Sequence, residues 1–268
     1  MRHAKLVNPL APVVNFIGKT ATIAELEARK LNHDQTEVLT RTVQPALWLL
    51  VFGEVLAQTR AIQTGNLPYL DFITPGILAQ SVLFIAIFYG IAVIWERDLG
   101  TLHKLLASPA PRSALVLGKA LSASERGLLQ AAIIYVLAFA LRVKLNLNPL
   151  ALVAVLFIVI LSSALFSTFS LIIACLVKTR ERFMGIGQLL TMPLFFASNA
   201  IYPVSIMPSW LQAIAQVNPL TYEVDGLRAL MVQNGASVYG FALDLGFLLV
   251  ATALLIIVAA HLYPRVVV

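Results

Sequence analysis

The chain has 268 residues, of which 59% are hydrophobic and 12% charged, with a formal net charge of +6 and a mean hydropathy of +0.87. Soluble domains are about 45–50% apolar, so this composition excludes an ordinary soluble protein. The positive charge does not call for nucleic acid, and none is expected as a partner, because basic loops beside anionic membrane lipids account for it.

The first 42 residues are expected to form a cytoplasmic N-terminal segment that precedes a transmembrane domain over residues 43–268. Prolines interrupt the short apolar run in this segment, which is therefore unlike a signal peptide. Thr22 and Glu25 have the spacing of a capping box, and the apolar residues that follow share one helical stripe. This pattern predicts an amphipathic helix over Thr22–Leu39 on the inner membrane surface, with a solvated helix as the alternative.

Six apolar runs come next, and a helix needs about 20 such residues to cross a bilayer. They are Val43–Thr59, Phe72–Trp95, Ala114–Leu141, Leu150–Val177, Met184–Ala200 and Val238–Tyr263. Lipid offers the backbone no hydrogen-bond partners, and the runs lack the alternation of barrel strands, so helices are expected. The predicted fold class is an all-α integral membrane protein with six transmembrane helices.

The basic residues predict the orientation. If the N-terminus is inside, only Arg60, Arg142, Lys144 and Arg228 fall outside, and Arg126 lies within the third run. The other fourteen of the 19 Lys and Arg residues then lie on the inner side, as the positive-inside rule requires. Both termini are therefore predicted to be cytoplasmic, and the location to be the plasma membrane, the inner membrane of a bacterial cell.

A charged segment, Glu96–Pro109, separates the second and third runs. Leu99, Leu102, Leu105 and Leu106 share one face at helical spacing, whereas the charged side chains point elsewhere. The residues alone predict a cytoplasmic amphipathic helix between two spans.

This segment also resembles a known motif. Glu96-Arg97-Asp98-Leu99-Gly100-Thr101-Leu102, followed by Leu105-Leu106 and Ser108-Pro109, resembles the coupling helix of ABC-2 type transporter permeases. A second block resembles the external segment of that family, and comprises Tyr202-Pro203, Met207-Pro208-Ser209-Trp210-Leu211, Asn218-Pro219-Leu220-Thr221-Tyr222, Val224-Asp225 and Leu227-Arg228. The resemblance covers most of the chain from about residue 43, and His103 departs from it, because such permeases often carry an acidic residue there.

The resemblance implies the transmembrane subunit of an ABC exporter, working as a homodimer or as a heterodimer with a close paralogue. It implies that a nucleotide-binding ATPase docks on the helix between spans two and three, through Glu96, Arg97, Gly100, Thr101, Leu102, Leu105, Leu106 and Pro109. It further implies a re-entrant external hairpin between spans five and six, carrying Tyr202, Pro203, Pro208, Trp210, Asn218, Pro219, Tyr222 and Arg228. For Trp210 and Tyr222, anchoring at the membrane interface without substrate contact is an alternative.

Ionisable residues inside apolar runs are costly in lipid and are candidates for function. Glu54 lies midway along the first run, and Glu125 and Arg126 lie in the third. They could line a polar translocation path, or Glu54 could tether helices, for example by pairing with Arg126. Asp244 and His261 lie near the two ends of the last run, where they can reach the interfaces, and are set aside.

The chain itself is expected to be neither an enzyme nor a cofactor or metal carrier. Gly18-Lys19-Thr20 resembles the end of a phosphate loop, but Val13 stands where its first glycine belongs. The four histidines lack metal-ligand spacing, and no Gly-x-Ser-x-Gly occurs. ATP and Mg²⁺ are therefore expected on a separate ATPase subunit.

The first, second and fifth runs are rich in aliphatic residues and phenylalanine, which favours a hydrophobic or amphipathic cargo such as a drug, a lipid or a lipid-linked molecule. The chain looks most similar to daunorubicin-type and multidrug-type exporters. The alternatives are a permease for lipid-linked polysaccharide or teichoic acid, and an ATP-independent secondary transporter. Many secondary transporters contain a matched pair of interrupted spans, and this sequence lacks such a pair, which argues against that last alternative.

Overall fold

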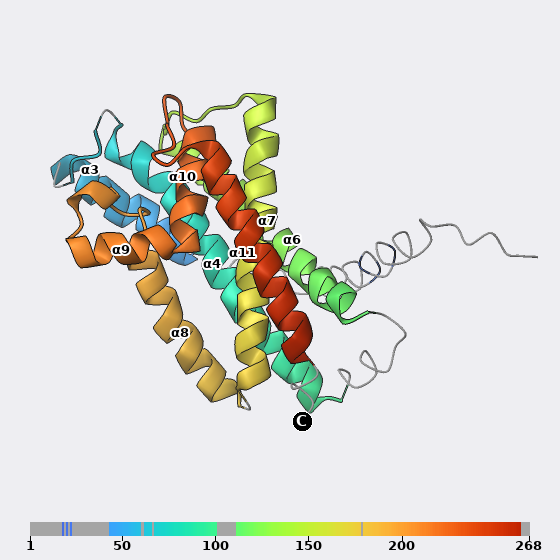
Figure 1. Cartoon of the computed structure of the whole chain (residues 1–268). Helices are drawn as coiled ribbons and strands as arrows, with labels where there is room; N and C mark the ends of the chain where they lie inside the picture. The colour runs from blue at the N-terminus through green and yellow to red at the C-terminus, as the bar shows by residue number, and fades with distance from the viewer. Residues whose placement is uncertain are drawn as a thin grey trace, which may run out of the picture.

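The computed structural model describes residues 43–59, 62–65, 67–100, 111–177 and 179–263, together with Gly18, Thr20 and Thr22. Within these residues every regular element is a helix, and the helices form one bundle (Figure 1). The all-α prediction is therefore confirmed. The predicted amphipathic helix over Thr22–Leu39 lies outside the described residues, except for Thr22 itself.

Four of the described helices are long and apolar enough to cross a membrane: α4 (Tyr69–Asp98), α6 (Arg112–Ala140), α7 (Pro149–Leu176) and α11 (Phe241–Leu262). Each coincides with a predicted run, namely the second, third, fourth and sixth, to within about three residues at either end. The prediction of membrane-spanning helices is confirmed for these four.

The first and fifth predicted runs form shorter helices. Residues 43–47 continue into a π-helix, η1 (Trp48–Gly53), and then into α3 (Glu54–Thr59). The fifth run forms α8 (Arg180–Phe196), which has 17 residues. At 1.5 Å per residue, such a helix reaches roughly 25 Å, less than the roughly 30 Å of a hydrocarbon core. The six-span layout therefore stays a prediction.

The sequence sets several helix ends directly. The Asn148 side chain caps α7 by accepting a hydrogen bond from the Leu150 amide at 3.0 Å, and Pro149 follows at the first helical position. Asn218 caps α10 (Pro219–Met231) in the same way, with a 3.0 Å bond from the Leu220 amide.

The end of α4 changes the predicted boundary of the charged segment. Glu96 and Arg97 belong to the last turn of α4, not to the start of a separate helix. Gly100 has a φ of 70°, the left-handed conformation that stops a helix and that glycine adopts without strain. Leu99 therefore stands at the end of α4, before the left-handed turn, and does not continue one helical face with the later leucines as predicted.

Helix α4 lies at the centre of the bundle and packs against α6, α7, α8 and α10. It approaches α7 closely at Gly90, whose amide donates to Ser170 Oγ at 3.1 Å. The same hydroxyl donates to the Ile87 carbonyl. Small residues and interhelical hydrogen bonds of this kind are typical of helix contacts in membranes.

Two ends of the bundle can now be distinguished. At the Asp98 end, α4, α7 and α11 finish and α6 and α8 begin; at the Tyr69 end, α4 begins and the short helices η2 (Val204–Ile206), α9 (Ser209–Val217) and α10 gather (Figure 1). Most of α9 is exposed, whereas α10 is buried against α4, α7 and α11. The α9–α10 pair occupies the place of the predicted hairpin, and its re-entry into the membrane stays a prediction.

Candidate functional site

A buried ion pair joins α4 to α6 at the Asp98 end. Lys119 Nζ lies 2.5 Å from Glu96 Oε2, and the two residues are 2% and 8% exposed. Glu96, predicted to contact an ATPase, thus has its carboxylate turned into the bundle. Apart from Arg97, the other predicted coupling residues lie in the connection between these helices. Of these, Thr101, Leu102, Leu105, Leu106 and Pro109 lie outside the described residues.

A second link joins α4 to α8 at the same end. Arg180 Nη2 lies 2.9 Å from Asp98 Oδ2, and the Arg180 guanidinium stacks 3.7 Å from the centre of the Trp95 ring. Arg97, a predicted coupling residue, pairs with the other Asp98 oxygen at 3.1 Å. The last turn of α4 is therefore joined by ion pairs to both α6 and α8.

Among the predicted intramembrane residues, Glu54 begins α3, whereas Glu125 and Arg126 are neighbours in α6. The Arg126 guanidinium faces the Tyr89 ring at 5.1 Å, within the α4–α6 interface. Glu125 and Arg126 are partly exposed, and among the described residues no ion pair joins Glu54 to Arg126. A role for these residues in a translocation path stays a prediction.

At the Tyr69 end, the predicted residue Arg228 ties α10 to α4. Its Nη2 donates to the Asn199 carbonyl at 2.7 Å, and its Nε and Nη2 both approach the Phe72 carbonyl at 3.4 Å. The guanidinium also lies 3.8 Å from the centre of the Phe72 ring. Arg228 is buried, so these carbonyls and the ring replace its hydration.

A carboxylate network fixes the start of α11. Asp225 Oδ2 accepts from the Val238 and Tyr239 amides at 2.7 and 3.0 Å. Ser237 Oγ lies 2.9 Å from the same oxygen and 2.7 Å from Asp244 Oδ2. Asp244 is fully buried, with its carboxylate held by Ser237. The expectation that it reaches the membrane interface stays a prediction.

Asn218 joins α8 to α10. Besides capping α10, its Nδ2 donates to the Leu194 carbonyl at 2.7 Å and to the Ala197 carbonyl at 3.0 Å. These oxygens lie at the end of α8, where helical carbonyls lack partners of their own. One buried side chain thus completes the hydrogen bonding of two helix ends.

The other predicted external residues also have definite places. Tyr222 stacks on Phe247 with ring centres 4.0 Å apart and donates to the Gln216 carbonyl at 2.6 Å. Tyr202 donates to the Phe196 carbonyl at 2.6 Å, whereas Trp210 is 65% exposed on α9. The predicted prolines precede or open helices: Pro203 before η2, Pro208 before α9 and Pro219 at the start of α10.

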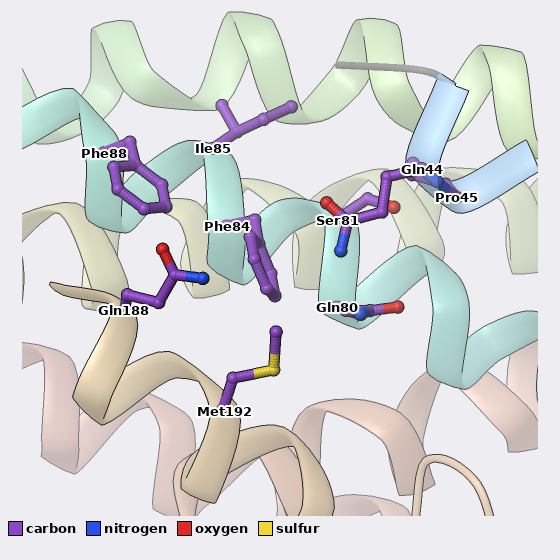
Figure 2. A pocket seen from close by; sticks show the side chains of 9 residues that line it. All are labelled: Gln44, Pro45, Gln80, Ser81, Phe84, Ile85, Phe88, Gln188 and Met192. Atoms are coloured by element: carbon purple, nitrogen blue, oxygen red, sulfur yellow. The ribbon is translucent and has the colours of Figure 1, made fainter. Parts of the chain in front are cut away.

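A cavity of about 290 Å³ opens between the start of the first helical run, α4 and α8 (Figure 2). Its walls comprise Gln44 and Pro45, then Gln80, Ser81, Phe84, Ile85 and Phe88 of α4, and Gln188 and Met192 of α8. Figure 2 shows Gln188 and Met192 directed toward the space beside the Phe84 ring.

Sequence reasoning missed Lys119 and Gln80, and it set Asp244 aside. Lys119 lies inside the third predicted run, so the rule that singled out Arg126 there also applied to Lys119. Asp244 lies inside the last run, so the same rule also made it a candidate. Gln80 gives a weaker signal, since an uncharged amide in an apolar run is not remarkable until its surroundings are known.

The fold and the two polar ends define a helical membrane protein whose helices are joined by ion pairs and carbonyl contacts. Comparison with known proteins identifies its family: the model of the ABC-2 type transporter matches residues 19–232. The chain belongs to the ABC-2 type transporter family.

Named relatives agree with this assignment. The putative transport permease ycf38 of Cyanophora paradoxa is 32% identical over 197 residues, which are 72% of this chain and 67% of the relative. The daunorubicin resistance ABC transporter permease protein DrrB1 of Streptomyces coeruleorubidus is 25% identical over 233 residues, 87% of this chain and 80% of the relative. Nodulation protein J of Rhizobium leguminosarum bv. trifolii is 26% identical over 197 residues, 73% and 74% of the two chains. The chain covers about two thirds of the ycf38 relatives, including 64% of the one from Porphyra purpurea.

Proposed function

We propose that this chain is the transmembrane subunit of an ABC exporter. It moves a hydrophobic or amphipathic molecule out of the cytoplasm or the inner leaflet, using ATP hydrolysed by a separate nucleotide-binding subunit. Two such chains form the transmembrane unit, and the Asp98 end faces the cytoplasm. The name of the Streptomyces relative, which refers to daunorubicin resistance, supports an amphipathic cargo.

The observation that carries the proposal is the pair of ion links at the Asp98 end. Glu96–Lys119 joins α4 to α6, and Asp98–Arg180 joins α4 to α8. In the sequence, segment 101–110 follows Asp98 by two residues and leads into α6. A displacement of that segment by an ATPase would therefore act on three helices together, a rigid-body form of switching.

The first test is co-purification from the native host after gentle solubilisation. We expect a stoichiometric ATPase subunit to accompany the chain. Repeated recovery of the chain alone in a monodisperse state would contradict the proposal, and flux driven by an ion gradient would favour a secondary transporter instead.

A variant pair then tests coupling. Leu102→Glu introduces a charge on the predicted docking face, and we expect the reconstituted complex to lose the stimulation of ATP hydrolysis by the permease. Leu147→Glu is the control, because Leu147 is 60% exposed in the connection at the opposite end. Equal hydrolysis in the two variants would refute the assignment of the coupling segment.

A further inference from the structure

A single serine hydroxyl lies between two carboxyl groups at the start of α11. Ser237 Oγ is 2.9 Å from Asp225 Oδ2, on α10, and 2.7 Å from Asp244 Oδ2, on α11. It also accepts a hydrogen bond from the Gly240 amide at 2.7 Å. A hydroxyl has one hydrogen to donate, so Ser237 cannot donate to both carboxyl groups. If it donates to one of them, the other must bring a hydrogen of its own.

The surroundings of the two carboxyl groups show which of them brings it. Asp225 Oδ2 also accepts from the Val238 and Tyr239 amides at 2.7 and 3.0 Å, and the Asn199 side-chain amide lies 3.5 Å from Asp225 Oδ1. Such N–H donors stabilise the ionised form of a carboxyl group. Asp244 is fully buried, and its Oδ1 has no hydrogen-bond partner among the described residues. Because a buried charge without partners is costly, Asp244 is the group that holds the hydrogen.

The neighbouring ionisable groups favour the same assignment. Arg228, one turn further along α10, interacts electrostatically with Asp225 and so favours its ionised form. Tyr222 of α10 and Tyr239 of the connection before α11 interact with Asp244, but tyrosine side chains are uncharged near neutral pH. Among the described residues, no basic group is paired with the Asp244 carboxyl.

The other helices packed against α11 add no charge near Asp244. Helix α7 has no charged side chain, and the charged residues of α6 end at Arg126, which leaves Tyr135 as the ionisable residue of α6 nearest this end. Glu223 of α10 is also fully buried, but its carboxyl group interacts with Ser162 of α7.

The network joins a surface segment to two buried side chains. Val238 is 76% exposed, so segment 237–239 lies at the surface, whereas Asp225 and Asp244 are buried. If Asp244 lost its proton, two negative carboxylates would face one hydroxyl, and one of them would lack a donor. Movement of the segment away from the helices would relieve this, because it would admit water to the carboxylates.

We propose that Asp244 holds a proton, which it donates to Ser237 Oγ, and that the loss of this proton releases segment 237–239 from α10 and α11. The Tyr69 end of the bundle thus contains a pH-sensitive switch. The segment is held at low pH, while Asp244 is protonated, and is released as the pH rises and the proton leaves. This inference goes beyond the proposed export function and does not depend on it.

A spin label on the segment measures its release. Cys175 is the one cysteine of the sequence, so Val238→Cys in a Cys175→Ala chain gives a single labelling site at an exposed position. Electron paramagnetic resonance then follows the mobility of the label as the pH is raised, with the full chain in lipid nanodiscs. We expect an immobile label at low pH that becomes mobile in one titration. A label at Leu147→Cys, exposed in the α6–α7 connection at the same end, should not respond.

Three substitutions assign the response to this network. Asp244→Asn donates an N–H to Ser237 but has no proton to lose, so the label should stay immobile at every pH. Ser237→Ala removes the shared hydroxyl from a half-buried position outside the helices, and the response should be lost there too. Glu223→Gln removes the other fully buried carboxyl group of α10 and should leave the response unchanged.

A label at Val238→Cys whose mobility does not change with pH overturns the proposal. The same holds for a response that persists in Asp244→Asn or in Ser237→Ala, and for one that disappears in Glu223→Gln. The assay contains no ATPase, so failure of the switch leaves the exporter proposal standing, and failure of the ATPase to associate leaves the switch standing.

Discussion

Asn218 and Asn148 form a matched pair that tests how a single side chain joins two helices. Both begin an Asn-Pro-Leu sequence and accept a 3.0 Å bond from the amide two residues on. Asn148 is exposed, whereas Asn218 is buried and its amide also donates to two carbonyls at the end of α8. Serine keeps a capping oxygen at either position but has no amide group to donate.

The two substitutions should therefore differ in magnitude. Serine and asparagine cap helices about equally well, so Asn148→Ser should change the free energy of unfolding by less than about 0.5 kcal/mol. Asn218→Ser leaves the Leu194 and Ala197 carbonyls without their buried donor. Each unsatisfied buried group costs about 1–3 kcal/mol, so a loss of about 2 kcal/mol or more is expected.

Thermal unfolding in detergent, followed by helical circular dichroism, measures the difference. A loss of about 2 kcal/mol corresponds to a fall in Tm of roughly 4–8 °C for a chain of this size. Asn148→Ser should shift the Tm by less than about 2 °C on the same scale. Equal shifts in the two variants would refute the reasoning, since they would show that the bonds to α8 contribute nothing beyond the cap.

Three further substitutions test other contacts. Glu96→Gln leaves the buried Lys119 ammonium without its counter-charge and should cost about 3–5 kcal/mol, most of which a Glu96→Leu/Lys119→Met double variant should recover; a single variant with the parental Tm would contradict this. Gly90→Ala places a methyl group against Ser170 Oγ and should cost about 1–3 kcal/mol, whereas Gly246→Ala meets nothing within 4 Å and should be nearly neutral; similar Tm values would disprove the close contact. Arg180→Ala removes the link to Asp98 and should lower permease-stimulated ATP hydrolysis with little change in Tm, while Arg182→Ala, an exposed neighbour, should not; unchanged hydrolysis in both would show that the link transmits nothing.

The helices that the sequence predicted well are those for which composition alone is decisive. Long apolar runs located α4, α6, α7 and α11 because a membrane span needs length and apolarity, and both are visible in one dimension. The boundary at Gly100 was missed, since leucine spacing continues across it while the backbone turns left-handed. Local caps such as Asn148 follow from neighbours two residues away and are predictable for that reason.

The site residues were harder to predict, because their partners are distant in sequence. Arg228 bonds the carbonyl of Phe72, 156 residues earlier, and Arg180 bonds Asp98, 82 residues earlier. A motif can mark such a residue as important, as it did for Arg228, but not name its partner. Glu96 shows that a motif also does not predict the direction of a side chain. Its motif suggested a contact with another subunit, whereas Lys119 holds its carboxylate inside the bundle.

These contacts give α8 an unusual position in the bundle. One end is held to α4 through Arg180 and Asp98, and the other is held to α10 through Asn218. Between these ends α8 packs on α4 and only lightly on α7, and there it supplies Gln188 and Met192 to the cavity. A force applied at the Asp98 end would therefore act on the helix that supplies Gln188 and Met192 to the cavity.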